Sequence, residues 1–263
     1  MSRIKQLFER KNNHVLNIYC TAGFPKLDST LPVMKALQES GADIIELGMP
    51  YSDPLADGVT IQNSSKVAIA NGMNMRVLFQ QLKDMRKAPE EGGIGNDIPV
   101  VLMGYMNPVL QYGFEKFCAD AAAVGVDGLI LPDMPPHEFE GVYRSIIEKY
   151  QLDFIFLVTP ETSEERVRKL DSLSSGFLYA VSSSSTTGGE KDFEQVAKYL
   201  QKLQSYKLKN PIMVGFGIKD KQSFNKACQY ANGAIIGSAY IKFIQHAQSP
   251  EVITKSFVQS IIN

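Results

Sequence analysis

The fold is decided by the stretch VLNIYCTAGFP, residues 15–25. Its first part, residues 15–21, is an apolar run with little polar alternation, which is typical of a parallel strand buried on both faces. The turn that follows, Thr21-Ala22-Gly23-Phe24-Pro25, lacks the Gly-x-Gly-x-x-Gly fingerprint with which an open, doubly wound sheet binds a dinucleotide. The stretch therefore favours a closed barrel, and the open sheet is the competing interpretation.

The alternation of strand-like and helix-like segments continues along the chain. Further apolar runs lie at residues 43–49, 99–105, 128–132, 154–159, 177–182, 211–218 and 234–240. Helix-like segments lie at residues 28–40, 74–87, 114–124, 137–150, 163–173, 192–206, 219–230 and 250–262. Such an alternation forms βαβ units around a parallel sheet, and eight strands with eight helices close into a barrel. We therefore predict an α/β fold, a (β/α)8 TIM barrel.

The length of the chain and its first residues fit one such barrel. The 263 residues are close to the length of about 250 residues that is typical of this fold. Residues 1–11 carry apolar side chains at a helical spacing, which predicts an extra N-terminal helix that packs on the body. No linker, low-complexity tract or charge block divides the sequence, so we expect a single domain over residues 1–263.

Composition and charge argue against several functional classes. The 27 Lys and Arg against 28 Asp and Glu give a net charge of −1, whereas a general nucleic-acid binder shows a basic face. No stretch reaches the roughly 18 apolar residues that a membrane span needs. The three cysteines are widely spaced without a Cys-x-x-Cys pair, so we expect a reducing cytoplasm as the location. The three histidines are scattered, so we expect no metal site.

Two carboxylates are the candidate catalytic pair. Glu46 stands inside the second apolar run, where a carboxylate is costly unless it points into a polar cavity or has a partner. Asp57 lies on the loop that follows this run, at the end of the barrel where active sites of this fold occur. A structural ion pair is the alternative interpretation of Glu46. Two carboxylates in different surroundings let one act as acid and the other as base.

Two glycine turns predict a phosphate site. The seventh run contains Gly215-Phe216-Gly217-Ile218 and the eighth contains Ile236-Gly237-Ser238-Ala239. Barrels of this kind bind phosphate with the loops after these two strands, because backbone N–H groups and a helix N-terminus attract the anion. One such turn is weak evidence, but two at the expected strands indicate a phosphorylated substrate.

Two further features belong to the same end of the barrel. Residues 182–190, SSSSTTGGE, are interpreted either as a solvated loop or as a lid that closes over the substrate. Tyr19, Tyr105 and Tyr179 lie at or near strand ends, where they are either core residues or the walls of a pocket for a flat aromatic group.

The motifs taken together resemble a known signature. They are ELG at residues 46–48, SDPLADG at 52–58, IQ at 61–62, GVDG at 125–128, PDMP at 132–135, TG at 187–188, GFGI at 215–218 and GS at 237–238. These motifs span nearly the whole chain, and the stretch from 46 to 62 is long and specific. In this pattern the sequence resembles the tryptophan synthase alpha chain family.

The resemblance implies a barrel enzyme that cleaves indole-3-glycerol phosphate to indole and glyceraldehyde 3-phosphate. By position, Glu46 matches the residue that protonates indole C3 and helps to deprotonate the glycerol hydroxyl, and Asp57 matches the one that holds the indole N–H. The implied substrate contacts are Gly188, Gly217, Gly237 and Ser238 at the phosphate, Thr187 and Phe216 beside them, and Tyr19, Met103, Tyr105 and Tyr179 around the indole. The resemblance also implies no cofactor in this chain, and a pyridoxal-phosphate beta chain as partner in an α2β2 complex.

Two other interpretations stay open at this point. Another phosphate-binding barrel enzyme of aromatic or histidine biosynthesis would be expected to place a catalytic lysine or a different acid pair on its strand ends. A non-catalytic subunit would only bind a ligand and regulate the beta chain, and the intact pair of Glu46 and Asp57 argues against it.

Overall fold

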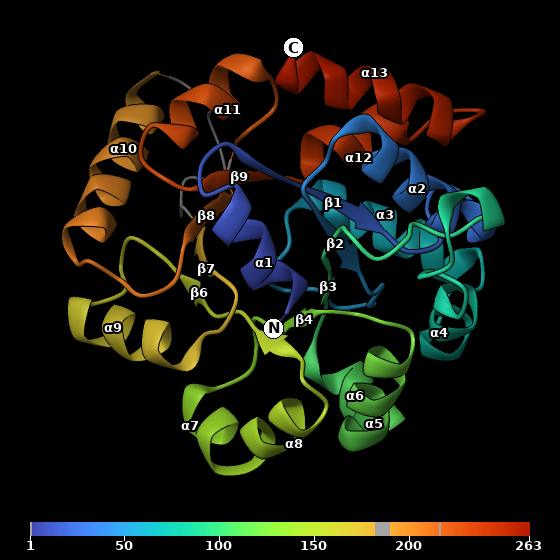
Figure 1. Ribbon diagram of the computed structural model, residues 1–263, viewed down its shortest axis with the longest axis horizontal. Helices are drawn as coiled ribbons and strands as arrows, with labels where there is room; N and C mark the ends of the chain where they lie inside the picture. Colours follow the sequence, from blue (N-terminus) through green and yellow to red (C-terminus); the bar gives the residue numbers. More distant parts are fainter. Residues whose placement is uncertain (1, 182–189, 216) are drawn as a thin grey trace.

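The computed structural model describes residues 2–181, 190–215 and 217–263. Within them, one parallel sheet occupies the centre and helices surround it (Figure 1). The strands are β1 Val15–Thr21, β2 Ile44–Gly48, β3 Val100–Met103, β4 Gly128–Ile130, β5 Asp153–Phe154, β6 Leu157–Val158, β7 Leu178–Val181, β8 Ile212–Gly215 and β9 Gly233–Ile236. Their order is β5-β4-β3-β2-β1-β9-β8-β7-β6, and every neighbouring pair is parallel.

The sheet closes through its fifth strand position, which is divided into β5 and β6. These segments stand at opposite ends of the strand order, but only Ile155 and Phe156 separate them in the chain. The Ile155 N–H donates to the Leu129 carbonyl and the Phe156 carbonyl accepts from the Tyr179 N–H, each at 3.0 Å. Residues 155–156 are thus hydrogen-bonded to β4 on one side and to β7 on the other, so the sheet is closed and the predicted TIM barrel is confirmed. The strand expected at 154–159 is present as the two short strands β5 and β6.

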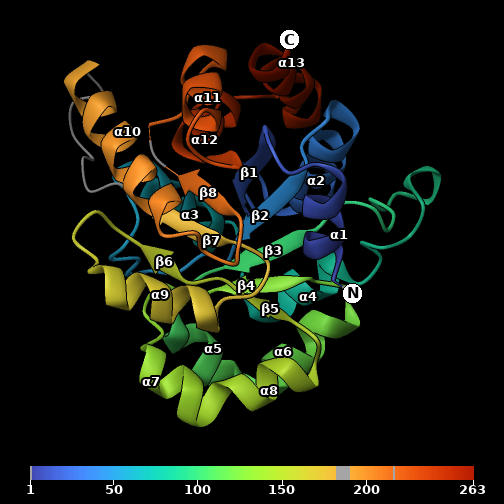
Figure 2. The ribbon, with the colours of Figure 1, turned by 60° about the vertical axis from the view of Figure 1, so that its left-hand side comes forward.

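The helices lie outside the sheet, as Figure 2 shows for α9 beside β6. They are α1 Arg3–Arg10, α2 Thr30–Ser40, α3 Val59–Ala70, α4 Met75–Leu82, α5 Met106–Tyr112, α6 Phe114–Ala123, α7 Pro136–Glu138, α8 Arg144–Lys149, α9 Glu164–Leu173, α10 Glu190–Ser205, α11 Lys221–Cys228, α12 Ser238–Ile244 and α13 Pro250–Ile262. Short helical turns are η1 Leu27–Ser29, η2 Pro89–Glu91 and η3 Phe139–Tyr143. Among the described residues, no helix is both long and apolar enough to cross a membrane.

Three helices were not predicted, namely α3, α5 and α12. The strand expected over 234–240 ends at Ile236, and its second half is the beginning of α12. Helix α3 escapes a search for an apolar stripe because it buries Ser64 and Ser65 and exposes Val59 and Val67. The buried Ser64 hydroxyl is hydrogen-bonded to the Thr21 hydroxyl at 2.7 Å, which offsets the cost of placing it against the sheet.

Helix α1 closes the N-terminal end of the barrel, which confirms the predicted extra helix. Its Ile4, Leu7 and Phe8 pack into the apolar interior of the barrel. Arg3 is bonded to the buried Asp127 at 2.8 Å, which ties the helix to the sheet beside β4. Since this end is filled, a substrate must enter at the opposite end, where the strands have their carboxyl termini.

Candidate active site

Glu46 lies inside the barrel on β2. Alternate residues of a strand face opposite sides, so Glu46 shares the inward face with Ile44, whereas Ile45 and Leu47 pack outward against the helices. The side chain is 1% exposed. Its Oε2 accepts a hydrogen bond from Asn17 Nδ2 on β1 at 3.0 Å, and its Oε1 has no partner. Burial raises the pKa of Glu46 to about 8, against the opposing effect of the Asn17 hydrogen bond.

Asp57 lies on the loop between β2 and α3, one residue before the Gly58 that precedes the helix. Its N–H donates to the Pro54 carbonyl at 3.0 Å, and its carbonyl accepts from Gln62 Nε2 of α3 at 2.8 Å. The Tyr105 hydroxyl accepts from the neighbouring Ala56 N–H at 3.0 Å, which joins this loop to the end of β3. Partial burial raises the pKa of Asp57 to about 6, and a hydrogen bond with the Tyr105 hydroxyl opposes that rise.

The two carboxyl groups differ in protonation near neutral pH. The Asp57 charge contributes to the raised pKa of Glu46, so the two groups act on one another electrostatically. Between pH values of about 6 and about 8, Glu46 is mostly protonated while Asp57 is mostly ionised. A pair whose surroundings separate their pKa values in this way can supply an acid and an anion to the same substrate.

Two tyrosines lie across glycines of the neighbouring strands. Tyr19 of β1 is paired in register with Glu46, and a methyl group on Gly48 would lie 2.0 Å from the Tyr19 hydroxyl oxygen. Tyr179 of β7 is related in the same way to Gly215 of β8, where the corresponding distance is 2.4 Å. The phenol rings therefore cross the barrel interior close to Glu46, and the glycines leave room for them.

The close approach gives a testable prediction. Gly48→Ala places a methyl group within the van der Waals radius of the Tyr19 hydroxyl, so the ring must leave its position. We expect a loss of about 1–3 kcal/mol in the free energy of unfolding, and a rise in KM of about tenfold because the Tyr19 ring beside Glu46 has moved. Thermal unfolding and substrate titration measure the two effects. Gly141→Ala, where the methyl group meets nothing within 4 Å, is the matched control. Unchanged stability and KM in Gly48→Ala contradict the assigned contact.

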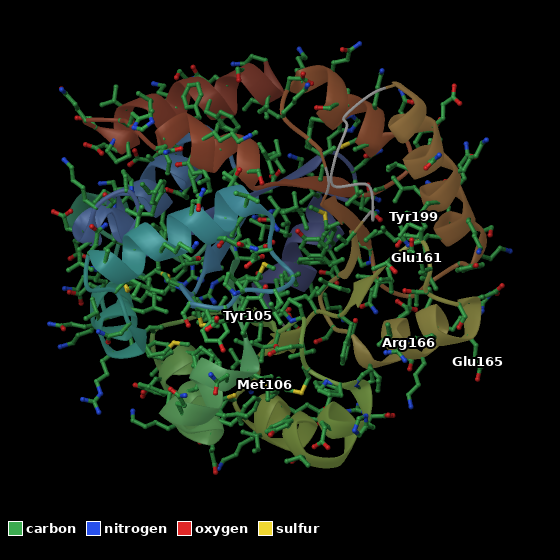
Figure 3. All side chains as sticks on the ribbon, turned by 180° about the vertical axis from the view of Figure 1, so that it is seen from behind. Tyr105, Met106, Glu161, Glu165, Arg166 and Tyr199 are labelled. Atoms are coloured by element: carbon green, nitrogen blue, oxygen red, sulfur yellow. The ribbon has the colours of Figure 1, made fainter. Side chains whose placement is uncertain are left out.

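Tyr105 and Met103 mark the rim of the site at β3. Met103 is the last residue of β3 and is half-buried, and Tyr105 directly precedes α5. The Tyr105 ring lies 5.5 Å from the Tyr51 ring, measured between centroids. Tyr105 and Met106 lie next to one another at the beginning of α5, as Figure 3 shows from the side opposite to that of Figure 1. The Met106 N–H donates to both carboxylate oxygens of Asp133 at 3.0 Å, so the loop after β4 holds the beginning of α5 in place.

The described part of the expected phosphate site lies after β8 and β9. Gly217 has a φ of 60°, which glycine adopts without strain, and its surroundings are open. Gly237 lies beside Tyr19, since a methyl group there would be 3.5 Å from the Tyr19 Cβ. Ser238 is exposed and is the first residue of α12. Thr187, Gly188 and Phe216 lie outside the described residues, as does the predicted loop or lid at residues 182–189.

Two residues of this site, Asn17 and Gly48, were not assigned a structural or catalytic task from the sequence. Asn17 is a polar residue inside an apolar run, which is a usable signal because a buried amide needs a partner. Gly48 is a glycine inside a strand, which often marks a close approach of another group. Among the described residues, no three His, Cys, Asp or Glu side chains are grouped so that they could hold a metal ion.

Comparisons with known proteins agree with this geometry. The sequence model of the family described as tryptophan synthase alpha chain matches residues 5–261. The tryptophan synthase alpha chain of Bacteroides thetaiotaomicron is 46% identical over 95% of this chain and 96% of its own length. That of Flavobacterium johnsoniae is 47% identical over 96% of this chain and 97% of its own length.

Solved structures give the same result. Tryptophan synthase subunit alpha from Legionella pneumophila superposes with a TM-score of 0.88 at 33% identity, covering 99% of this chain and 97% of the other. A chain of tryptophan synthase from M. tuberculosis in its aminoacrylate-bound form gives 0.83 at 31% identity, covering 99% and 98%. The present chain belongs to the tryptophan synthase alpha chain family.

Proposed function

We propose that Glu46 and Asp57 carry out the retro-aldol cleavage of indole-3-glycerol phosphate to indole and glyceraldehyde 3-phosphate. The supporting observation is that the two carboxyl groups lie in different surroundings, with Glu46 buried inside the barrel and Asp57 on the loop before α3. Their pKa values, raised to about 8 and about 6, suit an acid and an anion near neutral pH. Membership of the family argues against the alternative of a different phosphate-binding barrel enzyme.

The chemistry needs a proton at C3 of the indole, a negative charge near its N–H, and a base for the glycerol hydroxyl. Glu46 donates its proton to C3, and Asp57 accepts the indole N–H and stabilises the cation that forms. The carboxylate of Glu46 then helps to remove the hydroxyl proton while the bond between C3 and the glycerol carbon breaks, so the two proton transfers balance. Each such group contributes about 10²–10⁴-fold to the rate, and neither step requires a metal or a cofactor in this chain.

The substrate is held at both ends. We assign the phosphate to the backbone and hydroxyl groups of Gly217, Gly237 and Ser238, together with Thr187, Gly188 and Phe216, which lie outside the described residues. Gly and a serine hydroxyl suit this task because phosphate oxygens approach backbone N–H groups closely. We assign the indole to the region between Tyr19, Tyr179, Tyr105 and Met103. The contact between Gly237 and Tyr19 brings the two parts of the site next to one another.

An assay of indole formation from indole-3-glycerol phosphate tests the proposal. The purified chain is expected to release indole slowly, and faster when the cognate beta chain is added, because docking fixes the position of the loop that carries Asp57. Absence of indole with a demonstrably bound beta chain contradicts the proposal, and favours the alternative of a non-catalytic subunit.

We propose the beta chain as partner, in an α2β2 complex in which pyridoxal phosphate belongs to the beta chain alone. The loop that carries Asp57 also presents Leu55, which is 93% exposed, and Val59 at the start of α3 is 71% exposed. Solvent-exposed apolar side chains next to a catalytic group indicate a surface that a partner protein covers. Docking there places the partner against the very loop that positions Asp57.

Leu55→Ser tests this surface. We expect the beta-chain concentration for half-maximal stimulation of indole release to rise about tenfold, which is the loss typical of an apolar anchor at an interface. Val252→Ser on α13 is the matched control, because Val252 is 68% exposed but lies on another helix, away from the Asp57 loop. Equal stimulation curves for the two variants contradict the assignment of the docking surface.

We further propose that residues 1–263 form a single domain and that the protein is located in a reducing cytoplasm. The first helix closes the barrel, and the last helix, α13, packs against α2, where Ile262 meets Gly41. Both ends of the chain thus contribute to one body. Cys20, Cys118 and Cys228 are buried and free, which suits a compartment that keeps thiols reduced.

A further inference from the structure

Asn17 is an amide in an apolar part of the barrel. It is completely buried on the inward face of β1, in register with Ile44 of β2, and the residues that share this interior include Val15 and Val101. Its Nδ2 donates to Glu46 Oε2 at 3.0 Å, and its Oδ1 has no partner. A leucine has the same branched shape without the cost of an unsatisfied carbonyl, so packing alone does not account for an amide here.

The hydrogen bond makes the two oxygens of Glu46 different. Oε2 is held by Asn17, whereas Oε1 is buried and has no partner. When Glu46 is protonated, Oε2 can still accept from Asn17 as the carbonyl oxygen, which leaves the proton on Oε1. We propose that Asn17 is a positioning residue for the cleavage reaction, holding Oε2 of Glu46 so that Oε1 is the atom that exchanges the proton with the substrate. This inference rests on the proposed function of Glu46.

Asn17 also has an electrostatic consequence. Four titratable groups from the surrounding elements are coupled to Glu46. The charge of Asp57 on the loop raises the pKa of Glu46, and the charge of Glu46 in turn raises the pKa of Tyr19 and Cys20 of β1 and of Tyr179 of β7. None of these groups carries a positive charge. Among the described residues that influence Glu46, the amide of Asn17 is therefore the one that favours its anion, because it donates a hydrogen bond to the charged form. The anion is the form that removes the hydroxyl proton in the second half of the reaction.

The substitution Asn17→Leu removes the donor and keeps the approximate shape. In the isolated chain, carboxyl-labelled glutamate allows Glu46 to be titrated by 13C NMR, with its signal assigned by its loss in Glu46→Gln. We expect the midpoint of Glu46 to rise by about one to two pH units in Asn17→Leu, as a hydrogen bond to a charged group requires. The alkaline limb of the kcat/KM profile, which reports the free protein, should shift by the same amount. We expect kcat at neutral pH to fall about tenfold, with KM within twofold of the wild type. Asn17 lies nearer to the N-terminal end of the barrel than Glu46 does, and so it does not contact the substrate.

Two further variants make the outcome decisive. Asn17→Ala removes the amide without adding volume, and should raise the midpoint in the same direction even if the leucine does not fit. Ile18→Val alters the outward face of the same strand and should leave the midpoint unchanged. A midpoint within about 0.3 units of the wild type in Asn17→Leu or Asn17→Ala overturns the inference, whatever the activity. A shifted midpoint in a chain that never releases indole instead overturns the proposed function and retains the coupling of Asn17 to Glu46.

Discussion

Replacing Glu46 by glutamine is expected to lower kcat for indole release by about 10²- to 10⁴-fold, the range for loss of a positioned acid–base group. Glutamine has almost the same shape and can still accept the hydrogen bond from Asn17, but it has no proton to give to C3. We expect KM to change little, because the phosphate contacts lie on other strands. Single-turnover measurements with the isolated chain separate the loss of chemistry from any change in product release. Glu91→Gln, at an exposed position on η2, is the control.

The stability of Glu46→Gln distinguishes lost chemistry from lost structure. The pKa of Glu46 is raised from 4.5 to about 8 in the folded protein, so the folded state binds the proton more tightly than the unfolded state. In the wild type, the contribution of Glu46 to the free energy of unfolding is fully present below pH 4.5 and is lost as the pH rises towards 8. The neutral glutamine does not incur this loss. At pH 9 the variant should be more stable than the wild type by up to about 4–5 kcal/mol, at 1.36 kcal/mol per pKa unit, as measured by urea unfolding. An inactive variant that is also less stable at pH 9 contradicts this account of Glu46.

The barrel could be predicted from the sequence because each strand and helix has its own local pattern and these patterns repeat along the chain. Each strand is a short apolar run, and the helix-like segment expected at 163–173 begins at Ser163, whose side chain caps α9 by accepting from the Arg166 N–H. Glu46 is conspicuous for the same reason, since a carboxylate inside an apolar run requires an explanation. Asp57 follows from the rule that places functional loops after strands.

The features that were missed depend on contacts between distant residues. The serines of α3 are buried because one of them meets Thr21, 43 residues away, and no periodicity within α3 contains that information. The hydrogen bond of Asn17 joins residues 29 positions apart, and only the register of β1 against β2 brings them together. Likewise, the fifth strand is divided where Ile155 turns to β4 and Phe156 to β7, which is a consequence of closure and not of local propensity.

The substitution Asp57→Asn is the second change for which we expect a large loss, about 10²- to 10³-fold in kcat. An asparagine carbonyl can still accept the indole N–H, so the substrate is oriented as before. The amide is neutral, however, and cannot stabilise the cation that forms when C3 is protonated. A loss of this size with a nearly unchanged KM therefore assigns the effect of Asp57 to its charge and not to its shape.

The pH profile of Asp57→Asn gives the sharper test. In the wild type, kcat/KM should rise as Asp57 ionises with a pKa of about 6 and fall as Glu46 loses its proton with a pKa of about 8, because kcat/KM reports the groups of the free protein. The variant should lack the acid limb, and its alkaline limb should move to lower pH, because the Asp57 charge contributes to the raised pKa of Glu46. Asp53→Asn is the matched control, since this exposed carboxylate lies on the same loop, and both variants are measured in the isolated chain so that partner docking has no influence. If the limb near pH 6 persists in Asp57→Asn, another group titrates there, and the division of roles between the barrel wall and the loop is wrong.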